Sequence, residues 1–302
     1  MNVRSLYACA SALVLLSACT ASSTARACAS CGCGDPTITG MGVEKPYKNR
    51  VRLSLEERFG GHTAGTGDES DATWTLRSSL FASWSPDSRF TVLAMAPLVA
   101  TWIQTRSQPW QNATGLGDAE VSGRGVMFRD RSFSPRHLLS GLIGLKIPTG
   151  PRLHDDAGYP FAEDDQPGSG SWDPFAGLSY GYFGEKISVF SSGSYRYTTT
   201  GRRGYKHGQS VGGTAGVQFQ PIGVVALSLA ADFRWAAADR LPGGIDAPNT
   251  GGAMLALTPA ITIAPVERWL IRLAVQIHVA DWLYGNQTES HAVMLSTVVD
   301  LN

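Results

Sequence analysis

Residues Val224 to Trp235 read VVALSLAADFRW, and apolar and polar side chains alternate along this stretch. One face of an extended chain carries the larger apolar side chains, Val225, Leu227, Leu229, Ala231, Phe233 and Trp235. The opposite face carries Ser228, Ala230, Asp232 and Arg234. Because successive side chains of a β-strand point to opposite sides, the first face can meet lipid while the second meets water. The stretch therefore predicts one membrane-spanning strand of a β-barrel.

Similar alternation recurs from Arg50 to the end of the chain, in stretches separated alternately by short and long connections. We expect twelve strands, at 50–60, 72–84, 89–102, 115–128, 137–148, 172–183, 187–198, 210–220, 224–236, 253–264, 269–280 and 290–301. The short connections are 85–88, 129–136, 184–186, 221–223 and 265–268, and the long ones are 61–71, 103–114, 149–171, 199–209, 237–252 and 281–289. Bacterial barrels have short periplasmic turns and long extracellular loops, so both ends of residues 50–302 are expected in the periplasm. The predicted fold is all-β, a transmembrane antiparallel up-and-down β-barrel of twelve strands.

Composition agrees with a membrane barrel. Charged residues make up 17% of the chain, against about 25% in a typical soluble domain. The 25 basic and 25 acidic residues balance, which argues against a nucleic-acid partner, because nucleic-acid binding needs a basic stripe.

A soluble β-sandwich would also show alternation, but two features favour the membrane barrel. Aromatic residues such as Trp74, Trp102 and Trp282 lie near predicted strand ends, as in the two interfacial girdles of membrane barrels. The polar faces of the strands also carry too many charges for a packed core. We therefore expect the protein in the bacterial outer membrane, in contact with membrane lipid.

The first residues have the features of an export signal. Arg4 supplies a positive charge, and the apolar stretch Leu6–Ala18 is too short to span a bilayer as a helix. Ala25-Arg26-Ala27 fits a peptidase site that would make 1–27 the signal peptide. Leu16-Ser17-Ala18-Cys19 instead resembles a lipobox, with cleavage before a lipidated Cys19. We favour the first site, and the second stays open.

All five cysteines lie in the first 33 residues, and Cys28, Cys31 and Cys33 form a tight cluster in the expected periplasmic segment 28–49. Thiolates suit soft or borderline metals, so copper or zinc is a candidate ligand of these three residues. A disulfide with one leftover thiol is the alternative in an oxidising periplasm. The cluster thus offers a second functional hypothesis, a barrel with a metal-linked, structural or partner-binding role toward a periplasmic partner.

The polar faces of the predicted strands would line the lumen. They carry charges of both signs, and the candidate lumen-lining residues are Arg52, Glu56, Arg58, Arg77, Asp118, Glu120, Arg124, Lys146, Asp173, Arg196, Asp232, Arg234, Arg272, Gln276 and His278. Neighbouring strands of such a barrel can form cross-strand ion pairs. Two interpretations stay open, a charge network that fills the lumen and a path for permeation.

The long connection 149–171 is acidic, with His154, Asp155, Asp156, Glu163, Asp164 and Asp165. Carboxylate oxygens suit divalent cations such as Ca²⁺, and such cations bridge lipopolysaccharide at the outer surface. Lipopolysaccharide is therefore a predicted partner, and a solvated loop without bound cations is the alternative.

Three stretches resemble outer-membrane proteins of the meta-pathway phenol-degradation type (MetA-like). They are Gly115-Leu116-Gly117-Asp118, then Gly144-Leu145-Lys146-Ile147-Pro148-Thr149-Gly150, and then Gly168-Ser169-Gly170-Ser171-Trp172-Asp173. In that family a Gly-x-Gly-Asp strand precedes a Lys-x-Pro-Thr-Gly strand end, a long loop and a glycine-rich return into the barrel. The resemblance implies a channel or transporter that helps small hydrophobic or aromatic solutes across the outer membrane.

An enzymatic barrel is a further class of outer-membrane protein. Catalysis of the phospholipase type would need a serine and a histidine side by side on the lipid-facing side near the outer rim. His291 has such a position, but no serine-rich strand motif accompanies it. We therefore expect no enzymatic activity, and no cofactor apart from copper or zinc at the cysteine cluster.

Overall fold

The computed structural model describes residues 48–66, 70–105, 109–155 and 157–301. Both predicted cleavage sites, the cluster of Cys28, Cys31 and Cys33, and nearly all of segment 28–49 lie outside the described residues. Within the described ranges, no helix is long and apolar enough to cross a membrane.

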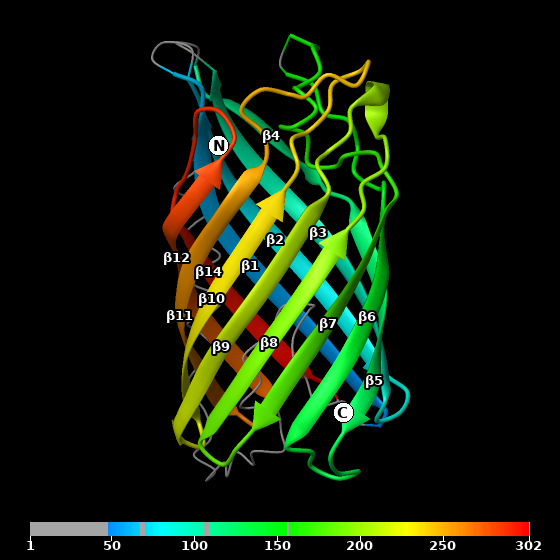
Figure 1. The fold of residues 1–302 in the computed structure, drawn as a ribbon, viewed down its shortest axis with the longest axis vertical. Helices are drawn as coiled ribbons and strands as arrows, with labels where there is room; N and C mark the ends of the chain where they lie inside the picture. The colour runs from blue at the N-terminus through cyan, green and yellow to red at the C-terminus, as the bar shows by residue number, and fades with distance from the viewer. Residues whose placement is uncertain (1–47, 67–69, 106–108, 156, 302) are drawn as a thin grey trace.

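The chain is a closed antiparallel β-barrel (Figure 1). Its strands are β1 (Arg50–Ala64), β2 (Asp71–Ser85), β3 (Phe90–Thr105), β4 (Gln111–Leu116), β5 (Ala119–Arg129), β6 (His137–Ile147), β7 (Asp173–Phe183), β8 (Ile187–Arg196), β9 (Ser210–Ile222), β10 (Val225–Ala236), β11 (Gly252–Val266), β12 (Trp269–Leu283), β13 (Gln287–Glu289) and β14 (Ala292–Asp300). Segments β4 and β5 both pair with β3, and β13 and β14 both pair with β1, so each couple forms one interrupted barrel strand. The prediction of a twelve-stranded up-and-down barrel is confirmed.

The barrel closes between its first and last strands. β1 pairs with β2 on one side and with β14 on the other, with Arg52 opposite Asp300. Both Arg50 and Arg52 donate paired hydrogen bonds to the Asp300 carboxylate, at 2.7 to 3.1 Å. Planar guanidinium groups match a carboxylate in this two-point geometry, which fixes the register of the closure.

The outward face of the wall is apolar. On β10, Leu227, Leu229 and Phe233 are 47%, 48% and 42% exposed, respectively, although large apolar side chains normally avoid water. Every second residue of the neighbouring strands repeats this pattern, as at Ile261 and Leu273. A bilayer is the environment in which such a surface is stable.

The two ends of the barrel differ in their connections. Short turns join the strands at the end where β1 begins, which we call the turn end, and the longest connections gather at the opposite end, the loop end (Figure 1). Several strands run further toward the loop end than the sequence predicts, because β1 continues to Ala64 and β12 to Leu283. These extensions were missed because the residues Gly61, His62 and Thr63, for example, lack the apolar alternation of a lipid-facing strand.

Candidate functional site

The inward face of the wall follows from the strand registers. Arg58 on β1 lies opposite Arg77 on β2, and Arg77 lies opposite Val99 on β3. Around the rest of the barrel the same face includes the partners Glu120 and Lys146, Phe175 and Arg196, and Asp232 and Thr214. Polar and charged groups therefore converge on the lumen from all sides.

The structure distributes the fifteen predicted lumen residues over three levels. Nine line a cavity in the middle of the barrel: Glu56, Arg58, Arg77, Glu120, Arg196, Asp232, Arg234, Arg272 and Gln276. Asp118, Lys146 and Asp173 form a cluster nearer the loop end, and Arg52 lies at the turn end with Asp300. Arg124 is buried, with its guanidinium 3.5 Å from the Thr91 hydroxyl, and His278 lies opposite Ala256. The part of these residues in moving a solute stays a prediction.

The middle cavity has a volume of about 580 Å³, within the range of about 300–1,000 Å³ typical of ligand pockets. Four of its arginines, Arg58, Arg77, Arg196 and Arg234, lie on the side of the loop end, and we call them the arginine collar. The collar residues come from β1, β2, β8 and β10. They therefore surround the lumen instead of forming a patch on one wall.

Apolar side chains line the part of the cavity nearer the turn end. We call this set the apolar chamber; its residues are Phe81, Leu93, Met95, Leu142 and Phe190. The order along single strands shows the arrangement. Phe81 lies nearer the turn end than Arg77 on β2, and Phe190 nearer than Arg196 on β8. Along β2 and β8 the cavity lining thus changes from an arginine toward the loop end to a phenylalanine toward the turn end.

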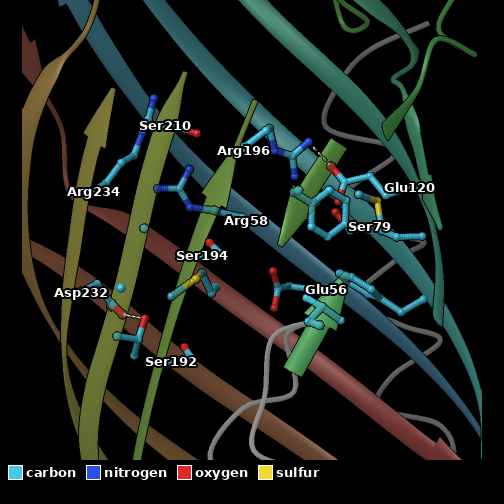
Figure 2. A pocket seen from close by; sticks show the side chains of 18 of the residues that line it. Glu56, Arg58, Ser79, Glu120, Ser192, Ser194, Arg196, Ser210, Asp232 and Arg234 are labelled. Carbon is cyan, nitrogen blue, oxygen red and sulfur yellow. Dashed lines mark hydrogen bonds and ion pairs between the residues drawn. The ribbon is translucent and has the colours of Figure 1, made fainter. Parts of the chain in front are cut away.

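Several charges of the cavity have partners. Arg196 donates to Glu120 at 2.7 Å and lies 4.9 Å from the centre of the Phe175 ring. Arg58 donates to the Gln276 amide oxygen at 2.8 Å. These contacts order two collar residues, as Figure 2 shows for Arg196 and Glu120.

The carboxylates Asp232 and Glu56 of the cavity also have hydrogen-bond donors. Asp232 accepts hydrogen bonds from the hydroxyl groups of Thr214 and Thr258, at 2.7 and 2.5 Å. Glu56 accepts a longer bond from Ser296, at 3.4 Å, and lies near the charge of Arg272. The carboxylates are therefore held against the wall.

The three motifs of the family resemblance meet at the break between β4 and β5. Asp118, in that break, accepts hydrogen bonds from the Gly150 N–H at 3.1 Å and from the N–H and hydroxyl of Ser169, both at 2.8 Å. Lys146 Nζ lies 3.6 Å from the Asp118 carboxylate and 2.5 Å from that of the fully buried Asp173. Each of the three motifs thus contributes a residue to the contacts that hold the ends of the loop 149–171.

Glycine is required where this loop enters and leaves the barrel. The Cα atoms of Gly150 and Gly168 face each other so closely that a Cβ on either would lie 2.9 Å from the other glycine. A Cβ on Gly168 would also approach Asp118 Oδ1 to 2.6 Å. Side chains at these positions would therefore push the loop away from the carboxylate that holds it.

The body of the loop 149–171 packs onto the inner wall of the barrel. Phe161 and Leu153 contact Ile103 on β3 and Ala113 on β4, and the last two are 3% and 1% exposed. Both wall residues belong to the inward face. The loop therefore narrows the loop end of the lumen from one side.

A second polar cluster joins the loops 197–209 and 237–251. The Asp239 carboxylate accepts bonds from the Tyr205 hydroxyl at 2.7 Å and the Gly208 N–H at 2.7 Å, and lies 3.1 Å from His207 Nδ1. Burial alone would raise the pKa of Asp239, but the hydrogen bonds from His207, Tyr205 and Gly208 hold that pKa below its usual value. Burial together with the Asp239 contact raises the pKa of Tyr205, so the phenol stays a hydrogen-bond donor.

Comparisons with known proteins bear on this architecture. No protein-family model matches the sequence, and no curated protein matches it. An outer membrane channel from Pseudomonas putida F1 superposes with a TM-score of 0.64 at 14% sequence identity, covering 84% of this chain and 96% of that one. The chain has the fold of an outer-membrane β-barrel.

Two further solved barrels that match are less similar. The translocator domain of the autotransporter NalP from Neisseria meningitidis gives a TM-score of 0.48 at 11% identity over 83% of this chain and 88% of that one. The P. putida toluene transporter TodX gives 0.43 at 11% identity over 85% and 91%. Such scores support no argument about this protein.

Sequence reasoning missed the apolar chamber and the role of Ser169. Leu93 and Met95 lie on the inward face of β3, but β3 is apolar on both faces, so alternation did not mark them. For metals, no group of three or more His, Cys, Asp or Glu in the described part of the chain is arranged to hold an ion. The predicted metal ligands Cys28, Cys31 and Cys33 lie outside that part, so their role stays a prediction.

Proposed function

We propose that the protein is an outer-membrane channel through which small hydrophobic or aromatic solutes pass. The observation that carries this proposal is the apolar chamber, a group of five large apolar side chains inside a lumen that also carries many charged and polar groups. A water-filled pore for hydrophilic solutes needs no such chamber, whereas an apolar or aromatic solute gains free energy from it. The fold shared with an outer membrane channel agrees with this role.

We also infer distant membership of the meta-pathway phenol-degradation type. What supports this is the cluster of Asp118, Lys146 and Ser169, which gives the three resembling motifs one shared structural task. The acidic loop 149–171 supports a contact with lipopolysaccharide through divalent cations.

A liposome uptake assay tests the channel. Purified protein is reconstituted into vesicles with lipopolysaccharide in the outer leaflet, which slows passive diffusion of apolar solutes. Uptake of aromatic and aliphatic solutes of similar size is compared with that of protein-free vesicles. Faster uptake of the aromatic solutes is expected, and equal rates with and without protein would contradict the proposal.

A pair of glycine substitutions makes the assay specific for the lumen. Gly212 lines the middle cavity, and a Cβ built there has only ordinary contact with Ser194 Oγ, at 3.6 Å. Gly212→Phe should fill the cavity and lower uptake severalfold. Gly125 belongs to the outward face of β5, where a Cβ meets nothing within 4 Å. Gly125→Phe is the matched control and should leave uptake unchanged.

A further inference from the structure

The arginine collar and the apolar chamber together select one chemical class of solute. Resting on the proposed function, we propose that the middle cavity binds amphipathic anions, namely small aromatic or alkyl carboxylates. The carboxylate would contact the collar toward the loop end, and the apolar body would lie in the chamber toward the turn end. A neutral hydrocarbon would use only half of this cavity.

The lining of the cavity carries more positive than negative charges. Its lining includes five arginines, the collar and Arg272, against the three carboxylates of Glu56, Glu120 and Asp232. Glu120 is bound by Arg196, and Glu56 lies near Arg272. Outside the cavity, Glu289 on β13 lies near Arg58. The cavity itself keeps an excess of positive charge.

Two arginines of the collar, Arg77 and Arg234, offer hydrogen-bond donors to a solute. Over the residues that the structure describes, neither Arg77 nor Arg234 makes a hydrogen bond or an ion pair with another side chain. Arg234 is exposed to the lumen and lies near enough to Arg58 for the two charges to repel each other. Figure 2 shows Arg234, from β10, and Arg58, from β1, projecting into the same pocket. An anion between them would relieve this repulsion and accept bonds from planar guanidinium groups, which suit carboxylates.

The apolar chamber lies at a distance from the collar that suits a small amphipathic solute. Phe81 is four residues from Arg77 along β2 and lies beside Met95, its register partner on β3. Side chains two positions apart on one face are about 7 Å apart along a strand, so this separation is on the order of 13 Å between Cα atoms. Long arginine side chains reach across part of that distance, which leaves room for a ring or a short alkyl chain beside a carboxylate.

The closing experiment measures binding in lipid nanodiscs by equilibrium dialysis, with empty discs subtracted. The probes are benzoate, benzyl alcohol, which has the ring without the charge, and acetate, which has the charge without the ring. Benzoate should bind at least about tenfold more tightly than either, because only benzoate uses both halves of the cavity. Equal binding of benzoate and benzyl alcohol would overturn the inference.

Substitutions assign the binding to the collar. Arg77→Gln combined with Arg234→Gln should weaken benzoate binding by about tenfold to a hundredfold, the range expected for lost hydrogen bonds to a charged group, and leave benzyl alcohol unaffected. Arg77→Lys with Arg234→Lys keeps the charge and should retain most of the affinity. Arg131→Gln, at an exposed turn-end arginine, is the control. Benzoate binding that all variants retain would contradict the collar assignment.

The binding experiment and the uptake assay test the anion site and the channel independently of each other. Collar-dependent benzoate binding without uptake of any solute would disprove the channel and leave the binding site. Uptake of neutral aromatic solutes with no preference for benzoate would support the channel and disprove the anion site.

Discussion

Asp118 holds Ser169 through two hydrogen bonds, from the Ser169 N–H and from its hydroxyl, each 2.8 Å long. The two residues are 51 positions apart, and the bonds connect the break in a barrel strand to the end of the loop 149–171. Asp118 is buried, and these donors and the Lys146 ammonium group are among its polar contacts. The Asp118 carboxylate thus joins both ends of the loop to the barrel wall.

Asp118→Asn should release this loop without unfolding the barrel. The amide replaces one acceptor oxygen with a donor and removes the charge that faces Lys146, so the loop should lose about 1.5–3 kcal/mol of local stability. Trypsin cleavage after Arg152 in the folded protein should become faster by about tenfold or more, since cleavage follows the population of the open loop.

Asp246→Asn provides the matched control for that substitution. Asp246 forms an ion pair with Arg240 in which both side chains are more than half exposed, and exposed pairs contribute about 0–1 kcal/mol. Cleavage after Arg152 should be unchanged in this variant. An Asp118→Asn protein that is cleaved no faster than the control would show that the carboxylate does not hold the loop.

The barrel could be predicted from the sequence because a lipid-facing wall and a polar lumen together give most of the strands an alternation with a period of two. The stretch 224–236, for example, corresponds to β10 (Val225–Ala236). The apolar chamber could not be predicted in the same way. Leu93 and Met95 are as apolar as their lipid-facing neighbours on β3. Only the register with β2 and β5 shows that they face the lumen.

The alternation of apolar and polar residues also could not predict the cluster at the loop end. Asp118, Lys146 and Asp173 were each expected in the lumen, and Lys146 and Asp173 meet as register partners on β6 and β7. Nothing in the spacing shows that Asp118 joins them, because its contact with Lys146 depends on the break between β4 and β5. Ser169, which joins them, has no sequence feature of its own beyond its place in a glycine-rich motif. Long-range contacts of this kind come from the three-dimensional fold.

The orientation of the barrel in the membrane can be tested with epitope tags. Tags at Pro160 and Pro248, both in long connections of the loop end, should be labelled on intact cells. Tags at Asp87 and Glu267, in short turns, should be labelled only after the outer membrane is permeabilised. Labelling of the second pair on sealed cells would reverse the orientation.

The cysteine cluster can be tested independently of the barrel. Replacing Cys28, Cys31 and Cys33 with serine should leave barrel assembly intact, because all cysteines of the chain precede Arg50, where β1 begins. The substitution should abolish any copper or zinc found by elemental analysis of anaerobically purified protein. Wild-type protein that contains no metal would rule out the metal role and favour the disulfide. Intact mass spectrometry would show whether the mature chain begins at Cys28 or at a lipidated Cys19.

The docking of the loop 149–171 should also depend on pH through Asp165. Burial, with the nearby charges of Asp164 and Asp71, raises the pKa of Asp165 from 3.8 to about 7 in the folded protein. The docked loop therefore binds a proton that the released loop gives up, and docking weakens as the pH rises between these two values. Above a pH of about 7 both forms are ionised, so no further change is expected from this residue.

Protection of Arg152 against a protease should thus be greatest at a pH below 3.8, fall as the pH rises to about 7, and then level off. Asp165→Asn removes the titrating group and should keep the protection high throughout this range. Any pH dependence that persists in the variant comes from groups other than Asp165. Wild-type and variant profiles that coincide would show that Asp165 does not control the loop, whereas a difference confined to the interval below pH 7 would assign the effect to its carboxyl group.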